Sequence, residues 1–241
     1  MKTLSIIIIA IALFASCNQA ETEKKSKENF DKSVKKIQKL PALSNDTVFD
    51  FENYEADKIP ENWSEYFTGK GDKTKWKIVD DNGNKVLAQL SQGSENYHFN
   101  EIVFNGFKAK NVKLEVRMKG VKGKMDQGGG FVWRFIDKDN YYVVRANPLE
   151  DNVVLYKVEK GIRTDLAVLG KGRTYGMEVP PLGNGWNNLK LMVVDDLFIV
   201  YLNFKEIFRV KDSTFMQAGK VGLWTKADAV SYFDDFMVKV K

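Results

Sequence analysis

Apolar and polar residues alternate with a period of two along most of the chain after residue 46, as they do in half-buried β-strands. The densest part of this pattern is residues 128–158, where three apolar runs (131–136, 141–146 and 153–158) are separated by DKDN and NPLEDN. The Asp, Asn and Pro residues of these connectors favour turns. The segment therefore predicts three consecutive antiparallel strands.

The alternation continues on both sides of this segment. In residues 112–118, apolar side chains at the even positions alternate with charged ones at the odd positions, which predicts one core face and one polar face. Asn82-Gly83 supplies the left-handed conformations that a tight hairpin needs between residues 75–79 and 85–90. Roughly a dozen or more short strands, and no convincing long helix, predict an all-β fold of two stacked antiparallel sheets.

The alternation also predicts which side chains are buried between the two sheets. The expected core includes Leu114, Val116, Phe131, Trp133, Phe135, Val193, Phe198, Val200, Leu223 and Phe236.

Composition and charge narrow the function classes. The 241 residues are 44% hydrophobic and 12% aromatic, which suits one sheet domain with a sizeable core. The formal charge of +5 comes from lysines scattered among acids. Neither a basic stripe nor a nucleic-acid recognition motif is present, so we expect no nucleic-acid partner.

The N-terminus has the features of a targeting segment. Met1-Lys2 is a positive start, and residues 4–15 are apolar apart from Ser5, a run too short for a comfortable membrane span. The sequence Leu13-Phe14-Ala15-Ser16-Cys17 that follows resembles the bacterial lipobox, with Phe14 where that motif usually has an aliphatic residue. Cys17 is the only cysteine, so it has no disulfide partner.

This resemblance implies that residues 1–16 are a signal peptide and that Cys17 carries a lipid anchor in the membrane. Residues 17–45 are charged and poor in aromatic residues, which predicts a flexible tether before a domain at 46–241. Asn18 is not the aspartate that the resemblance associates with inner-membrane retention. We therefore expect a location in the bacterial cell envelope, at the outer membrane.

Several motifs of the domain resemble known β-sandwiches. They are Trp133-Arg134-Phe135, Asn140-Tyr141-Tyr142, Leu155-Tyr156-Lys157-Val158, Trp186-Asn187-Asn188-Leu189-Lys190, and the pair Gly219-Lys220-Val221-Gly222-Leu223-Trp224 and Phe233-Asp234-Asp235-Phe236. Together they resemble the concanavalin A-like jelly rolls, in particular the laminin-G-like domains and the 3-keto-disaccharide hydrolase-like domains of bacterial lipoproteins. The resemblance covers about residues 49–241 and is specific for the fold. The same fold carries lectins, hydrolases and adhesion modules.

Charged and aromatic residues of the central strands form the candidate ligand site. Period two places Glu115 and Arg117 on one face, and Arg134 and Arg145 would join them if the strand register allows; Tyr142 has the opposite parity to Arg145. An acid beside arginines can orient sugar hydroxyls, and aromatic faces pack against sugar rings. We expect Arg134 to pair with Glu115. The same residues could instead form an internal salt-bridge network, and both interpretations stay open.

The sequence offers little support for catalysis. Glycoside hydrolase family 16, on the same fold, holds its acids as Glu-x-Asp-x-x-Glu, but Glu55-Ala56-Asp57 is followed by Pro60 at the last position. With His98 as the only histidine, no serine-elbow motif and no free catalytic cysteine, we expect no nucleophilic triad. As an isolated histidine in a polar stretch, His98 is expected at the surface.

No cofactor is required by any motif in the sequence. Asp50, Glu52 and Asp235 would be brought together if the first and last strands are neighbours, and calcium prefers such oxygen ligands. Solvated or turn-capping acids are the alternative for these three residues.

The sequence thus favours an envelope-anchored lipoprotein whose β-sandwich binds a glycan or a related polymer. One alternative is a glycoside-cleaving enzyme resembling the 3-keto-disaccharide hydrolases, with Glu115 as acid or base. A structural or adhesion module is the other alternative. A carbohydrate ligand and a membrane contact through the lipid are the expected partners.

Overall fold

The computed structural model describes residues 46–93 and 95–240, which all belong to one unit of the chain, residues 43–241. In this described part no helix is long and apolar enough to cross a membrane. The predicted signal peptide, the lipidated Cys17 and the tether lie outside the described residues and stay predictions.

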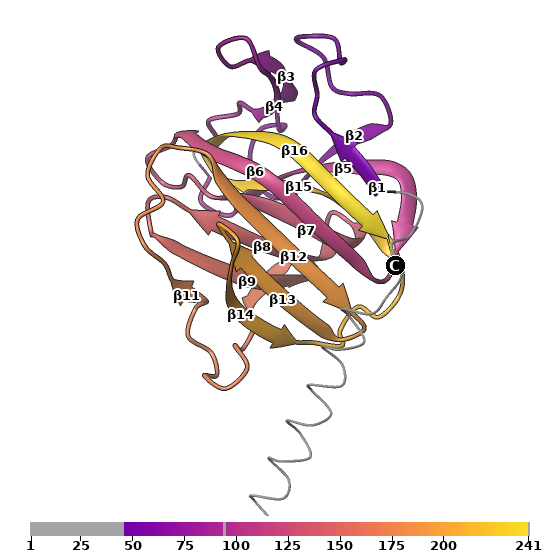
Figure 1. Cartoon of the computed structure of the whole chain (residues 1–241), viewed down its shortest axis with the longest axis vertical. Helices are drawn as coiled ribbons and strands as arrows, with labels where there is room; N and C mark the ends of the chain where they lie inside the picture. The colour runs from indigo at the N-terminus through magenta and orange to yellow at the C-terminus, as the bar shows by residue number, and fades with distance from the viewer. Residues whose placement is uncertain (1–45, 94, 241) are drawn as a thin grey trace, which may run out of the picture. The chain divides into compact units, whose positions relative to one another are not determined.

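The strands form two sheets in which every pairing is antiparallel. Sheet A has the order β14 (Lys205–Lys211), β13 (Leu197–Leu202), β12 (Asn187–Val194), β6 (Val112–Lys122), β16 (Val230–Val240), β4 (Lys85–Gln89) and β3 (Trp76–Asp80), and β1 (Asp46–Phe49) pairs with β16. Sheet B has the order β10 (Ile162–Asp165), β9 (Asn152–Glu159), β8 (Asn140–Asn147), β7 (Gly129–Asp137), β15 (Gly219–Lys226), β5 (His98–Ala109) and β2 (Trp63–Gly69), and β11 (Met177–Glu178) pairs with β9. In Figure 1, β12, β6 and β16 of sheet A lie in front of β7, β8 and β9 of sheet B.

This architecture confirms the predicted all-β sandwich of two antiparallel sheets. The three predicted central strands are β7, β8 and β9, which pair consecutively. The predicted hairpin joins β3 to β4, and both Asn82 and Gly83 have positive φ angles, of 60° and 89°.

The core between the sheets contains nine of the ten predicted residues, and the tenth, Phe135, is buried elsewhere. A β-bulge explains the difference, because the pairing of β7 with β8 is interrupted between Trp133 and Asp137, where Arg134 has a φ of 46°. The extra residue places Trp133 between the sheets and Phe135 on the outer face of sheet B. Gly219 makes room for the bulge, since a Cβ there would lie 2.6 Å from the Cα of Arg134.

The outer face of sheet B carries a second buried cluster. Its members alternate with the core residues of the same strands and are Phe99, Val103, Val132, Phe135, Tyr141, Val143, Val154, Tyr156, Val158 and Trp224. Sheet B curls over this face. One contact that shows the curl is the hydrogen bond that Thr68 on β2 donates to the carbonyl of Lys138 in the β7–β8 turn. At the same place the Tyr97 hydroxyl donates to the carbonyl of Gly161 in the β9–β10 turn, at 3.0 Å. The two edges of the sheet therefore approach each other across its outer face.

Candidate functional site

Glu115 and Arg117 lie on β6 and share the outer face of sheet A, as period two predicts. Glu115 accepts a hydrogen bond of 3.1 Å from the Asn188 amide, and its other oxygen lies 3.7 Å from Lys113 Nζ. Arg117 donates to Asp235 at 3.1 Å, and its guanidinium lies 4.9 Å from the centre of the Trp186 ring. These contacts are solvent-accessible ion pairs on the polar face of the sheet.

Arg134 is on the other sheet, so the predicted pair with Glu115 is not formed. Its guanidinium donates to three backbone carbonyls, those of Lys110 at 3.0 Å, Phe215 at 2.7 Å and Asp195. It also lies 5.6 Å from the centre of the Phe198 ring. The bulge has turned this side chain toward the loops at the end of the sandwich, where it joins three segments of the chain.

Tyr142 points into the core, on the opposite face of β8 from Arg145, as its parity predicts. Its hydroxyl donates to Asp212 and accepts a 3.0 Å hydrogen bond from the Phe215 backbone. Burial, with a further contribution from Asp212, raises the pKa of Tyr142. The structure therefore does not bring the five predicted ligand residues together, and only Arg145 has its side chain on the outer face of sheet B. Ligand binding by all five residues stays a prediction.

The three acids of the predicted calcium site have other partners. Asp50 accepts from the backbone N–H of Glu52, Glu52 accepts from the N–H of Lys85, and Asp235 pairs with Arg117. In residues 46–93 and 95–240, no group of three or more His, Cys, Asp or Glu side chains is arranged to hold a metal ion. The geometry gives no support to calcium at these positions, and calcium binding stays an untested prediction.

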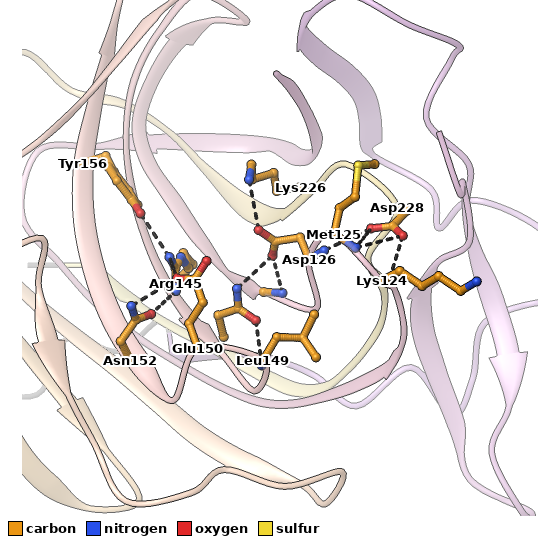
Figure 2. A network of polar contacts seen from close by, with 12 residues as sticks. Lys124, Met125, Asp126, Arg145, Leu149, Glu150, Asn152, Tyr156, Lys226 and Asp228 are labelled. Carbon is orange, nitrogen blue, oxygen red and sulfur yellow. Dashed lines mark hydrogen bonds and ion pairs between the residues drawn. The ribbon is translucent and has the colours of Figure 1, made fainter. Parts of the chain in front are cut away.

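A buried polar network surrounds Arg145 on the outer face of sheet B (Figure 2). Arg145 is 1% exposed and donates to Glu150 at 2.6 Å, to Asn152, and to the Tyr156 hydroxyl at 3.2 Å. Although burial opposes the charge on Glu150, Arg145 lowers the pKa of Glu150, so the carboxylate is ionised at neutral pH. The side chain of Glu150 is 38% exposed, which makes this network accessible from solvent.

Two aspartates hold the loop beside this network, as Figure 2 shows. Asp126 accepts from the backbone of Gly128 at 2.6 Å and pairs with Lys226 at 3.2 Å. Asp228 accepts from three successive backbone N–H groups, those of residues 124–126. The glycines that follow are needed for close packing, because a Cβ on Gly130 would lie 1.9 Å from the carbonyl oxygen of Val144.

Arginines and aromatic rings are stacked across the outer face of sheet B, from β5 to β8. The Tyr97 and Phe99 rings are 4.7 Å apart, and the Arg163 guanidinium lies 4.8 Å from Phe99 and 4.4 Å from Tyr156. The Arg145 guanidinium follows at 6.0 Å from Tyr156. We call these five residues (Tyr97, Phe99, Arg163, Tyr156 and Arg145) the aromatic–arginine ladder.

A surface hollow of about 490 Å³ adjoins the ladder at Tyr97. The residues that line it are Gly69, Lys70, Glu95, Tyr97, Lys138, Asp139 and Gly161. The Tyr97 side chain is 45% exposed, and its hydroxyl accepts a hydrogen bond of 2.6 Å from the backbone N–H of Arg163. One end of the ladder is therefore open to a ligand from solvent.

Sequence reasoning found only Arg145 of the ladder. It read residues 95–98 as a polar loop and expected His98 at the surface. His98 is instead 2% exposed, with its ring nitrogens at hydrogen-bond distance from the Lys70 carbonyl and Asn100. The available signal was the spacing of Phe99, Glu101 and Val103, which predicts a strand over residues 98–103 with these three side chains on one face.

Glu101 lies on the same outer face and is fully buried. Its Oε1 accepts from the Tyr141 hydroxyl at 2.7 Å and lies 3.0 Å from the Thr68 hydroxyl, whereas its Oε2 is buried without a hydrogen-bond partner in the described part of the chain. Burial raises the pKa of Glu101 to about 8, so the group is a neutral carboxylic acid at pH 7.

Comparisons with known proteins identify the fold. No protein-family model matches the chain, and no curated protein matches it in sequence. Among solved structures, the carbohydrate-binding module CBM66 from Bacillus subtilis is similar with a TM-score of 0.56 and 21% sequence identity, over 74% of this chain and 95% of that module.

The GH43 protein BlXynB from Bacillus licheniformis is also similar, with a TM-score of 0.54 and 14% identity. That match covers 84% of this chain but only 41% of BlXynB. At these identities the likeness shows a shared jelly-roll-like β-sandwich.

Proposed function

We propose that this chain is a glycan-binding lipoprotein of the bacterial envelope, and that its ligand contacts the outer face of sheet B. The observation that carries the binding proposal is the aromatic–arginine ladder, which starts in a solvent-open hollow and ends in the Arg145 network. Binding sites of small polar ligands combine apolar ring faces with a few fixed hydrogen-bonding groups. Sugar rings need both, because their C–H faces pack on aromatic rings and their hydroxyls bond to charged groups.

The fold supports this proposal by analogy. The module from Bacillus subtilis that shares the sandwich is a carbohydrate-binding module, and this chain spans almost its whole length. Because one fold can carry many functions, the analogy adds to the argument from the site without replacing it.

A screen of the purified chain on a glycan array tests the proposal. Calorimetry then measures the affinity for each glycan that binds. Tyr97→Ala removes the exposed ring of the hollow and should weaken binding by about tenfold or more, as expected for an aromatic residue at the centre of a binding site. Tyr201→Ala is the matched control, since Tyr201 lies half-buried on β13 of sheet A, where Lys190 covers its ring at 4.8 Å. Loss of binding in Tyr201→Ala but not in Tyr97→Ala would move the site to sheet A.

The envelope location rests on the resemblance of residues 13–17 to the lipobox. Cys17→Ser should release the protein from the membrane fraction into a soluble one. Mass spectrometry should find a lipid on Cys17 and no residues before it, and an unmodified cysteine in the mature chain would contradict the anchor.

Glycoside cleavage by an enzyme resembling the 3-keto-disaccharide hydrolases is a second candidate. The observation in its favour is that Glu115 and Arg117 share an accessible sheet face, as that hypothesis requires. Such chemistry normally uses two carboxylates. Turnover of a 3-keto-glycoside that is lost in Glu115→Gln would favour the enzyme. If neither binding nor turnover is found, a structural or adhesion role is favoured.

A further inference from the structure

Arg163 is the central residue of the aromatic–arginine ladder. It lies on the edge strand β10 in register with Val158, which places its side chain on the outer face of sheet B. Its guanidinium lies close to two rings from distant parts of the chain, at 4.8 Å from Phe99 on β5 and 4.4 Å from Tyr156 on β9.

The Arg163 side chain has no hydrogen bond or ion pair to another residue in the described part of the chain. Its Nη1 is buried without a hydrogen-bond partner, and its guanidinium makes no ion pair with a described residue. Asp165, two residues along the same strand, is hydrogen-bonded to Arg173, and Arg163 contributes only a weaker lowering of the pKa of Asp165. A buried donor without an acceptor is costly, so a cation kept in this state is a candidate for binding.

The N–H donors of Arg163 are what it offers to a ligand. Aromatic rings attract a guanidinium through its faces, whereas its N–H donors point outward in the plane. With two ring centres within 5 Å of the guanidinium carbon, the edge with these donors is where a hydrogen-bond acceptor binds. An anion with two oxygen atoms matches two adjacent N–H donors of that edge.

A second donor without a partner lies near the same Tyr156 ring. Arg145 uses Nη1 and Nη2 for Asn152, Glu150 and Tyr156, but its Nε is buried without a hydrogen-bond partner. With Arg145 only 1% exposed, this donor is closed to a ligand from solvent, whereas Arg163 is partly exposed and can be reached.

We propose that Arg163 binds the anionic group of an acidic glycan, a carboxylate or a sulfate. This inference rests on the proposed glycan-binding function and specifies its ligand class. The aromatic rings of the ladder pack against the sugar, and Arg163 selects acidic sugars over neutral ones. Selection arises because a neutral sugar leaves the charge of Arg163 unpaired.

Calorimetry with matched ligand pairs tests the proposal on the purified full chain. The carboxylate arm compares uronic acid oligosaccharides, such as oligogalacturonates, with their neutral methyl esters. The sulfate arm compares dextran sulfate with dextran. In at least one arm the charged ligand should bind roughly tenfold tighter or more than its neutral counterpart. Its affinity should also fall as NaCl is added, because salt screens the pairing.

Variants then assign the preference to Arg163. Arg163→Met should remove the preference for the charged ligand, and Arg163→Lys should keep part of it, because a lysine retains the charge without the forked donors. Arg117→Met is the matched control, since Arg117 also stacks on a ring but lies on sheet A and is already paired. It should leave the preference unchanged. If Arg163→Met does not fold, Arg163→Lys decides the assignment, and an undiminished preference in that variant would contradict it.

The outcomes separate this inference from the proposed function. Equal binding of charged and neutral members in both arms would overturn the inference and leave glycan binding standing. A preference that survives in folded Arg163→Met would also overturn it. Failure of the glycan array and of both arms would overturn both proposals together.

Discussion

The outer faces of the two sheets both carry charged and aromatic residues, but they use them in different ways. On sheet A, cations such as Arg117 and Lys113 meet carboxylates within reach of solvent, with Arg117 42% exposed. On sheet B, Arg145 and Glu101 are almost completely buried among aromatic rings. The difference follows from curvature, because the edges of sheet B approach each other across its face.

The comparison shows that the same residue types have different consequences on the two faces. Exposed ion pairs contribute about 0 to 1 kcal/mol, since water competes for both charges. Buried charges and unpaired donors are costly, so they persist where a network or a ligand satisfies them. Sheet B is therefore where substitutions should affect stability and binding most.

The largest expected effect is a pH dependence of stability caused by Glu101 on sheet B. The pKa of Glu101 is raised from 4.5 to about 8 in the folded protein, so the folded state holds its proton more tightly than the unfolded state. Its contribution to stability is fully present below pH 4.5 and is lost as the pH rises through 8, by up to about 1.4 kcal/mol per pH unit.

Urea unfolding of the wild type and Glu101→Gln between pH 5 and pH 9 measures this effect. The wild type should lose stability relative to Glu101→Gln as the pH rises. Equal pH slopes in the two proteins would mean that Glu101 is charged in the folded state, contrary to the expectation.

The next-largest effect is the loss of stability when an arginine is replaced, compared for one arginine from each sheet. Arg145→Met should lower the free energy of unfolding by about 3 kcal/mol, because it leaves Asn152 and the partly buried Glu150 without their partner. Arg117→Met should lower it by less than about 1 kcal/mol, as for an exposed pair. Chemical denaturation of both variants at pH 7 gives the two values, and similar losses would contradict the distinction between the faces.

The smallest effect concerns apolar side chains on the two outer faces. Val143 of sheet B is 0% exposed, so Val143→Ala should cost about 2 kcal/mol through lost burial and a small cavity. Met192 of sheet A is half-buried, and Met192→Ala should cost about 1 kcal/mol or less, although it removes more atoms. Thermal unfolding of the two variants ranks them, and the reverse order would show that the outer face of sheet B is not a packed layer.

Much of the fold could be predicted from local pattern. The period-two alternation in residues 112–118 correctly separated the core face of β6 from its charged face. The turn residues between β7, β8 and β9 correctly predicted three consecutive strands. Local patterns suffice here because each hairpin joins neighbours in sequence, and a strand with one buried face repeats every two residues.

The candidate site was harder to predict, because its residues meet only through the curl of sheet B. Arg163 and Phe99 are far apart in the sequence and belong to strands at opposite sides of the sheet. The period-two pattern fails at Arg134, because the bulge turns its side chain toward three backbone carbonyls and away from the sheet that carries Glu115.

The sequence by itself determined the strands, the hairpins and the residues that must be buried, since these depend on periodicity and turn chemistry. The tertiary structure decided which sheet each strand joins, and therefore that Glu115 and Arg134 lie on different sheets. It also decided that the outer face of sheet B is a second buried layer, and that Arg163 lies within 5 Å of two of its ring centres. These features depend on strand order, register and sheet curvature, which are set by contacts between residues distant in the sequence.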